Sequence, residues 1–240
     1  TAFDITEIRD HEIQLLDPTL VYPIFRVESR ENFERLINAD ERNFKQPEEQ
    51  NVIPAVNFQI TDDHLGEGGP KQKYVRNIEA IRLLYTLEEE KRNATPEEQE
   101  VLSQYVGWGG LADAFDKNKT AWSKEYEELK NLLPEREYEM ARASTLNAHY
   151  TSPVVIRAMY DAMAQMGFTS GNILEPAMGI GNFFGMMPEE MRNSRLYGVE
   201  LDSISGRIAK KLYPNADITV AGFETTDRRD FFDVAIGNVP

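Results

Sequence analysis

Short apolar runs alternate with helical patterns over the last third of the chain. Asn172-Ile173-Leu174-Glu175 is a candidate for a buried strand, and Leu196-Tyr197-Gly198-Val199 is a second one, which ends at Glu200. Two more strand candidates follow, and the last leads into Gly237-Asn238-Val239-Pro240. Strands that alternate with helices are typical of a parallel sheet with helical crossovers. Residues 144–240 are therefore expected to form an α/β domain, whose last strand, beginning at Asp233, is an edge that the helices of residues 71–143 are candidates to cover.

Residues 71–143 follow a helical pattern instead. Two sets of apolar residues recur at the spacing of a helix face: Tyr74, Ile78, Ile81 and Tyr85, and then Trp122, Tyr126, Leu129 and Leu133. Pro134 is expected to start the next helix. The pattern predicts a mainly helical region ahead of the α/β domain.

One helix start in this region is marked by its sequence. In Thr95-Pro96-Glu97-Glu98, threonine suits the N-cap, proline the first turn, and Glu98 the reciprocal position of a capping box. The inward side chains are predicted to be Val101, Leu102, Tyr105 and Val106. The helix is expected to end at Gly107-Trp108-Gly109-Gly110. That loop is either a helix end with a buried tryptophan anchor or a loop that lies near a ligand.

A further helix is predicted to begin at Ser152-Pro153 and to end at Gly167. Its apolar face is predicted to consist of Val155, Met159, Ala162, Met163 and Met166. We interpret this stripe as core packing and not as a cofactor site.

Residues 1–70 have the weakest secondary-structure pattern of the chain. Strands are predicted at 21–28 and 52–60, with a helix at about 31–40, and Gly66-Glu67-Gly68-Gly69-Pro70 reads as a loop or linker. The predicted organisation is thus a small mixed α+β segment at 1–70, a helical region at 71–143 and the α/β domain at 144–240.

Charge and composition limit the possible functions. The net charge is −15, and most of the acidity lies early: residues before Ser144 carry 18 Lys and Arg against 30 Asp and Glu. This balance argues against DNA binding by the chain alone, because phosphate contacts need basic residues. There is no cysteine, which suits a reducing cytoplasm. No apolar run approaches the roughly 20 residues that span a bilayer.

No metal site is expected. The three histidines (His11, His64 and His149) form no metal-ligand pattern. The group Asp62, Asp63, His64 and Glu67 is interpreted as a solvated turn, with metal ligation as the alternative.

The glycine loop after the first strand carries the candidate chemistry. Gly179 and Gly181 sit just past the strand end, where ligands bind in open α/β sheets. Glu175, before the loop, suits a cation such as the ammonium of an amino acid and would repel a pyrophosphate. Glu200, at the end of the next strand, suits a ribose diol. A nicotinamide dinucleotide site also fits Glu200, but its fingerprint needs a third glycine where this chain has Phe184, so the pattern favours S-adenosylmethionine.

These motifs occur in the order of the amino-type DNA methyltransferases, which the chain resembles. That family modifies the exocyclic nitrogen of adenine. The resemblance rests on Asn147 to Pro153, Glu175 to Phe183, Glu200-Leu201-Asp202 and Asp233 to Pro240. A narrower resemblance, through Tyr105 to Leu111 and Ala143 to Thr151, is to the methyltransferase–helicase proteins of conjugative and phage-like mobile elements.

The resemblance implies a Rossmann-like methyltransferase fold, S-adenosylmethionine as cofactor, and a set of site residues. The implied catalytic residues are Asn238 and Pro240, which would hold a flipped adenine. The implied cofactor-binding residues are Tyr150, Thr151, Glu175, Pro176, Ala177, Gly179, Gly181, Phe183, Glu200, Leu201, Phe223 and Glu224.

Two positions depart from the family pattern. Val239 replaces the first proline of an Asn-Pro-Pro-aromatic motif, and Gly222 stands where many relatives have an aspartate, with Glu224 as a candidate substitute. We expect the chain to be the cofactor-binding half of an adenine-N6 DNA methyltransferase, cut at its catalytic motif and inactive alone, with DNA bound through the full-length protein. An inactive scaffold of a mobile-element anti-restriction protein is the second hypothesis. The sequence leaves the oligomeric state open.

Overall fold

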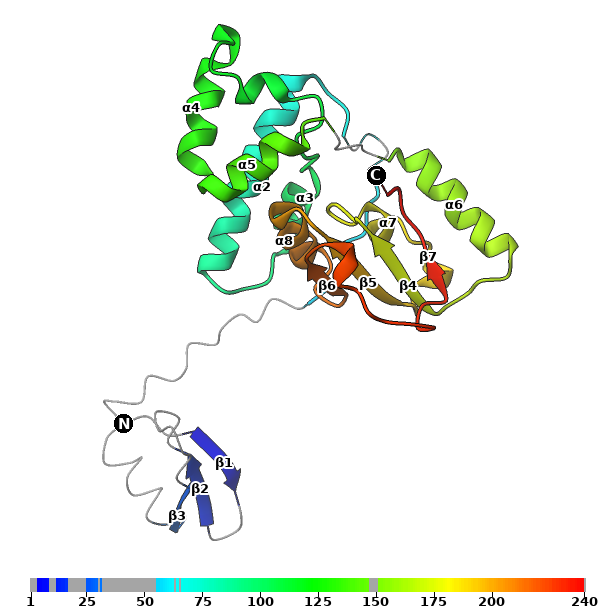
Figure 1. Cartoon of the computed structure of the whole chain (residues 1–240). Coiled ribbons are helices and arrows are strands. Elements are labelled where there is room, and N and C mark those ends of the chain that lie inside the picture. Colours follow the sequence, from blue (N-terminus) through cyan, green and yellow to red (C-terminus); the bar gives the residue numbers. More distant parts are fainter. Residues whose placement is uncertain are drawn as a thin grey trace. The chain divides into compact units, whose positions relative to one another are not determined.

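The computed structural model describes residues 4–8, 12–16, 25–29, 31, 55–62, 64, 66–146 and 151–239. The chain divides into two compact units, Thr1–Val52 and Ile53–Pro240. The first unit contains a three-stranded antiparallel sheet in the order β1-β2-β3 (Figure 1). Its strands are β1 (Asp4–Ile8), β2 (Glu12–Leu16) and β3 (Phe25–Ser29).

The sequence prediction for this unit was partly right. The strand predicted at 21–28 is confirmed for its described part, which is β3, whereas β1 and β2 were not predicted. Apart from Glu31, the helix predicted at about 31–40 lies outside the described residues.

The strand predicted at 52–60 is wrong for residues 55–60, which form no ladder. Their backbone donors reach the carboxyl ends of two helices instead. The Phe58 amide donates to Leu212 O at 2.8 Å, and the Ile60 amide donates to Gly185 O at 2.8 Å. Carbonyls at a helix end lack partners within the helix, so this extended segment satisfies them and needs no strand partner.

The second unit is built on a four-stranded parallel sheet in the order β6-β5-β4-β7. The strands are β4 (Asn172–Pro176), β5 (Arg195–Glu200), β6 (Asp217–Val220) and β7 (Val234–Ala235). Numbered from β4 along the chain, this is the order 3-2-1-4 of a Rossmann-type sheet. The predicted α/β fold with a parallel sheet is confirmed. In register, Glu175 lies beside Gly198, and Glu200 lies beside Val220.

Helices precede the sheet and connect its strands. The long helices are α2 (Pro70–Glu89), α3 (Pro96–Ser103), α4 (Ser123–Leu132), α5 (Glu135–Ser144), α6 (Pro153–Gln165) and α8 (Ser203–Leu212). Short turns are α7 (Asn182–Gly185) and the 3-10 segments η1 (Ala112–Phe115), η2 (Thr120–Trp122), η3 (Glu189–Met191) and η4 (Phe223–Thr225). Among the described residues, no helix has the length and apolar character needed to cross a membrane.

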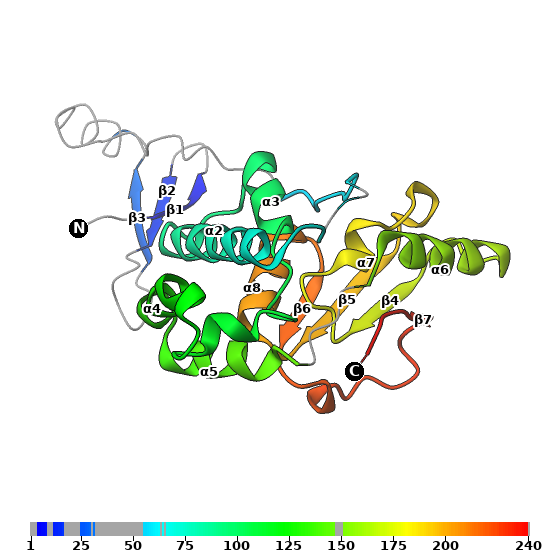
Figure 2. The ribbon, with the colours of Figure 1, turned by 90° about the horizontal axis from the view of Figure 1, so that it is seen from above.

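The helical region packs at the β6 end of the sheet. Helices α2 and α3 contact α8, whereas β7 forms the opposite edge, with α6 on its side (Figures 1 and 2). The idea that residues 71–143 cover the β7 edge is therefore wrong. Arg207 of α8 ties these elements together, because its guanidinium donates to Glu88 at 2.9 Å and to Glu137 at 2.7 Å. Buried apolar side chains of the helices and of the sheet form one continuous core.

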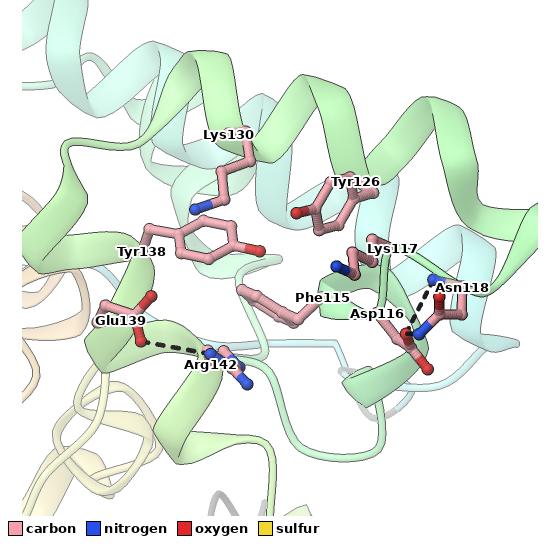
Figure 3. A pocket seen from close by; sticks show the side chains of 9 residues that line it. All are labelled: Phe115, Asp116, Lys117, Asn118, Tyr126, Lys130, Tyr138, Glu139 and Arg142. Carbon is pink, nitrogen blue, oxygen red and sulfur yellow. Dashed lines mark hydrogen bonds and ion pairs between the residues drawn. The ribbon is translucent and has the colours of Figure 1, made fainter.

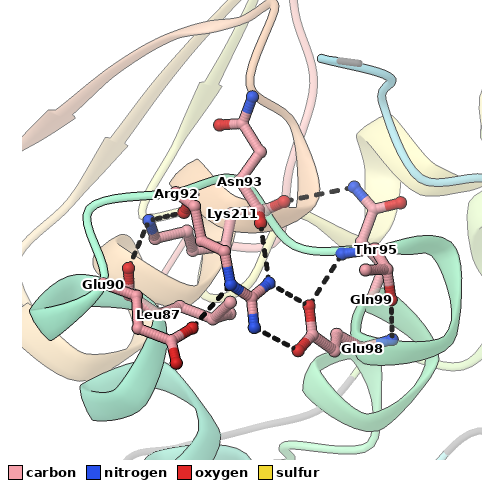
Figure 4. Close-up of polar contacts among 8 residues, drawn as sticks. All are labelled: Leu87, Glu90, Arg92, Asn93, Thr95, Glu98, Gln99 and Lys211. Carbon is pink, nitrogen blue, oxygen red and sulfur yellow. Dashed lines mark hydrogen bonds and ion pairs between the residues drawn. The ribbon is translucent and has the colours of Figure 1, made fainter. Parts of the chain in front are cut away.

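The capping box at Thr95 is confirmed. The Glu98 amide donates to Thr95 Oγ1 at 3.2 Å, and the Thr95 amide donates to Glu98 Oε2 at 2.8 Å. Arg92 grips the same Glu98 carboxylate with two nitrogens, at 2.6 and 2.7 Å, and Lys211 of α8 donates to Arg92 O at 2.6 Å (Figure 4). The prediction that the Val101 side chain faces inward is wrong, because this residue is 39% exposed. Gln99 is buried in this helix, and its side-chain amide donates to Val56 O and to Leu212 O at the end of α8.

The Gly107–Gly110 loop follows the structural interpretation. Trp108 is 1% exposed and makes edge-to-face contacts with Tyr74, Tyr105 and Phe115. The buried Asn77 holds the loop by accepting from the Val106 amide at 2.9 Å and donating to Gly107 O at 2.6 Å. Trp108 is therefore an anchor of the core.

Helix α6 forms as predicted, but only part of the predicted face is buried: Met163 is buried and Met159 packs against the core. Its buried residues are Pro153, Ile156, Tyr160 and Met163, whereas Val155 is 49% and Met166 is 78% exposed. Two neighbouring stripes of this helix are apolar, so periodicity alone could not choose between them. The Tyr160 hydroxyl donates to Phe183 O at 2.8 Å and orients the buried stripe toward the sheet.

Candidate functional site

The glycine loop after β4 has an unusual backbone. Ala177, Gly179 and Gly181 have φ values of 53°, 57° and 85°. This left-handed region is unfavourable for a residue with a Cβ, and single strained residues of this kind cluster at functional sites. The loop is held by β5, since the Met178 amide donates to Val199 O at 3.0 Å.

The two glycines serve different purposes. A Cβ on Gly181 would lie 2.6 Å from the Tyr213 ring and 2.8 Å from Met178 Cε, so the core requires glycine there. A Cβ on Gly179 would meet no heavy atom within 4 Å. Only the backbone conformation therefore requires glycine at 179, and the open space beside it is available to a ligand.

Glu200 is joined to this loop. One of its carboxylate oxygens accepts from the Gly179 amide at 2.6 Å, and the other accepts from the Asp202 amide at 2.7 Å. A carboxylate has about four acceptor positions, so these two hydrogen bonds do not use all of them. Burial raises the pKa of Glu200, while the amides of Asp202 and Gly179 oppose the shift.

Glu175 is the most buried acid of the site. Its residue is 3% exposed, and its Oε2 has no hydrogen-bond partner among the described residues. Burial raises the pKa of Glu175 well above its usual range, and the charge of Glu200 adds to the effect. The amides of Phe183 and Phe184, in the first turn of α7, favour the charged form.

A second unpartnered acceptor occurs at the same turn. Asn182, the first residue of α7, has a buried Oδ1 without a partner in the described part of the chain. Buried polar atoms normally have partners, so Glu175 Oε2 and Asn182 Oδ1 each keep an acceptor position that the described residues do not use. The sequence analysis did not single out Asn182, because an amide after a glycine loop carries no distinctive signal by itself.

The carboxyl edge of the sheet also exposes apolar side chains. Leu201 follows β5 and is 66% exposed, Phe223 follows β6 and is 54% exposed, and Val239 follows β7 and is 58% exposed. Parallel strands bring their carboxyl ends to one edge, so these side chains share it with the glycine loop. Glu224 is exposed, and its carboxylate folds back over Gly222. An apolar rim beside polar groups is typical of a ligand site.

The segment after β7 reaches this edge as well. A Cβ on Gly237 would lie 3.4 Å from Pro176 O and 3.8 Å from Glu175 Cγ, so Gly237 lies against the end of β4. The next residue, Asn238, is exposed.

The remaining predicted site residues lie as follows. Thr151 precedes α6 and is half-buried, and Ala177 is exposed in the loop. The Phe183 ring is 3% exposed and belongs to the core, which leaves only its backbone for the site. Tyr150 and Pro240 lie outside the described residues.

Comparison with known proteins gives two sequence relatives, and no family model matches. Over 167 residues, 68% of this chain, the sequence is 26% identical to Defense against restriction protein B of Escherichia phage P1. Over 73 residues, 30% of this chain, it is 41% identical to Type II methyltransferase M.CvrRI of Paramecium bursaria Chlorella virus XZ-6E. The matches cover 6% and 19% of these relatives, so the chain spans a small part of their length.

One solved structure is also similar. It is described as a class I S-adenosylmethionine-dependent methyltransferase from Listeria monocytogenes and is 16% identical, with a TM-score of 0.27 over 71% of this chain and 59% of that one. The chain therefore combines a Rossmann-type strand order with a 73-residue sequence similarity to a type II methyltransferase.

Proposed function

We propose that this chain is the cofactor-binding half of an S-adenosylmethionine-dependent methyltransferase that acts on the N6 amino group of adenine in DNA. The observation that carries the proposal is the pair of acids at adjacent strand ends. Glu175 is buried with an unpartnered oxygen, and Glu200 is bonded to the open Gly179 turn. Both have raised pKa values and neither has a cationic partner among the described residues, which favours a ligand that brings positive charge.

The residues present fit such a cofactor. Glu175 and Asn182 offer two buried acceptors to an ammonium group, and Glu200 retains acceptor positions for a ribose diol. Leu201 and Phe223 offer an apolar rim for a purine ring. The open side of Gly179 lets the backbone approach the ligand closely.

Chemistry would then take place beside β7. The bound cofactor would supply an electrophilic methyl group on a sulfonium. Asn238, next to the residue that lies against Glu175, would accept a hydrogen bond from the amino group of the target base and orient its lone pair. Positioning of this kind contributes much of the rate in a group transfer between two bound partners.

Calorimetry tests the binding half of this proposal. We expect S-adenosylmethionine and S-adenosylhomocysteine to bind and NAD not to bind. Glu200→Ala should weaken adenosyl binding by about 1–3 kcal/mol, the range for a hydrogen bond to a charged group. The exposed Glu190→Ala removes the same charge and serves as the control. Binding of NAD alone, or equal affinities in both variants, would contradict the proposal.

A second candidate function is a scaffold without catalysis. The similarity to Defense against restriction protein B favours it, and so do the departures at Val239 and Gly222. Failure of every adenosyl ligand to bind would support this alternative.

A further inference from the structure

A cavity lies in the helical region, away from the carboxyl edge of the sheet. It has a volume of about 330 Å³ and is formed by the segment after η1, by α4 and by α5 (Figure 3). Small-ligand pockets range from roughly 300 to 1,000 Å³, so this cavity is large enough for one compact ligand.

Cations and aromatic rings line this cavity together. Lys117, Lys130 and Arg142 bring the positive charges, and Phe115, Tyr126 and Tyr138 bring the rings. Phe115 and Tyr138 are buried, whereas Tyr126 of α4 is half-buried.

The cations are only weakly neutralised. Among the described residues, neither Lys117 nor Lys130 forms an ion pair, and Lys130 Nζ lies 4.0 Å from the centroid of the Tyr138 ring. Arg142 has one exposed pairing, to Glu139 at 3.6 Å. The remaining acid of the cavity, Asp116, is turned toward Asn118, whose backbone and side-chain nitrogens donate to it.

The acids of α4 and α5 explain why positive charge collects here. Three of them point to the other side of these helices and pair with neighbouring elements: Glu125 with Lys71 at 2.5 Å, Glu128 with Arg82 at 2.9 Å and Glu137 with Arg207 at 2.7 Å. The acidity of the region is thus partly neutralised inside the fold. In a chain of net charge −15, the cavity is lined by three cations and two acids, so positive charge is locally in excess.

We propose that this cavity binds one nucleotide unit, with its phosphate at Lys117, Lys130 and Arg142 and its base against Tyr126. Lysine and arginine donors suit a phosphate, and an aromatic face stacks on any base. A free nucleotide and a residue of a single strand offer the same chemistry, and the experiment distinguishes them. The proposal does not depend on the methyltransferase assignment.

Binding of pyrimidine probes tests this assignment, since they lack the adenine of the proposed cofactor. We expect thymidine 5′-monophosphate to bind saturably at low ionic strength, and Lys130→Gln or Arg142→Gln to weaken it about tenfold. The matched controls are Lys124→Gln and Arg136→Gln, which remove exposed charges of α4 and α5 that do not line the cavity; they should change affinity less than about twofold. Tyr126→Leu should weaken the nucleotide but not inorganic phosphate.

Binding of an oligonucleotide of about eight thymidines distinguishes a site for a free nucleotide from a site for a residue of a single strand. Tighter binding than the mononucleotide, with a steeper salt dependence, identifies a strand, and equal binding identifies a free nucleotide. The proposal is overturned if neither probe binds saturably, if inorganic phosphate binds as tightly as the nucleotide, or if the control variants lose as much affinity as the cavity variants.

Discussion

The pKa values of the carboxylates are shifted in opposite directions in the helical region and at the carboxyl edge of the sheet. In the helical region, Glu98 is held by Arg92 and Glu125 by Lys71, and these cations lower the pKa values of both acids. At the sheet edge, burial raises the pKa values of Glu175 and Glu200. Acids that stabilise a fold are paired within it. The acids kept buried without a cation are the pair on which the proposed cofactor site rests.

The largest expected effect concerns the two loop glycines. Gly181→Ala would place a Cβ against Tyr213 and Met178 at a left-handed φ, and should lower the free energy of unfolding by about 3 kcal/mol. Gly179→Ala has the strain but no clash, so it should cost only about 1 kcal/mol. Urea unfolding measures both values. Equal losses would show that the space beside Gly179 is not open.

Removing one carboxylate from each region should change stability in opposite directions. Glu98→Gln weakens the contact with Arg92 and should destabilise the protein by about 1–2 kcal/mol. Glu175→Gln removes an acid whose charged form burial disfavours, and it should stabilise the ligand-free protein by about 1 kcal/mol while weakening adenosyl binding. Thermal unfolding and calorimetry on the same samples check both signs. A destabilised Glu175→Gln variant would place Glu175 with the structural acids.

The pH dependence of stability should separate the two groups with a smaller effect. Glu98 and Glu125 have lowered pKa values, so their contribution is present above the unfolded-state value of about 4.3 and is lost as pH falls below it. Glu175 and Glu200 have raised pKa values, so the folded state binds more protons than the unfolded state, and stability declines as pH rises above about 4.3. Glu175→Gln should therefore show a shallower decline toward neutral pH. Parallel curves for the variant and the wild type would contradict this assignment.

The sequence predicted those structural elements that depend on the spacing of neighbouring residues. The Thr95 capping box and the order of strands and helices after residue 172 follow from neighbouring residues, and the structure has them. Features that depend on distant partners were missed. The buried face of α6 is chosen by the contact of Tyr160 with Phe183, and residues 55–60 bond to helix ends far along the chain.

The candidate site divides in the same way. The positions of Glu175, Gly179 and Glu200 could be predicted because a strand end, a turn and the next strand end define them. The unpartnered oxygen of Asn182 and the cavity beside Lys130 could not be predicted, since each depends on which groups the folded chain leaves without a neighbour.

A crystal structure of the chain soaked with S-adenosylmethionine tests the central claim most directly. We expect the ammonium group to lie within hydrogen-bond distance of Glu175 Oε2 and the ribose diol to contact Glu200, with the ligand over the open side of Gly179. Ligand density at any other place, or none at a saturating concentration, would contradict the account.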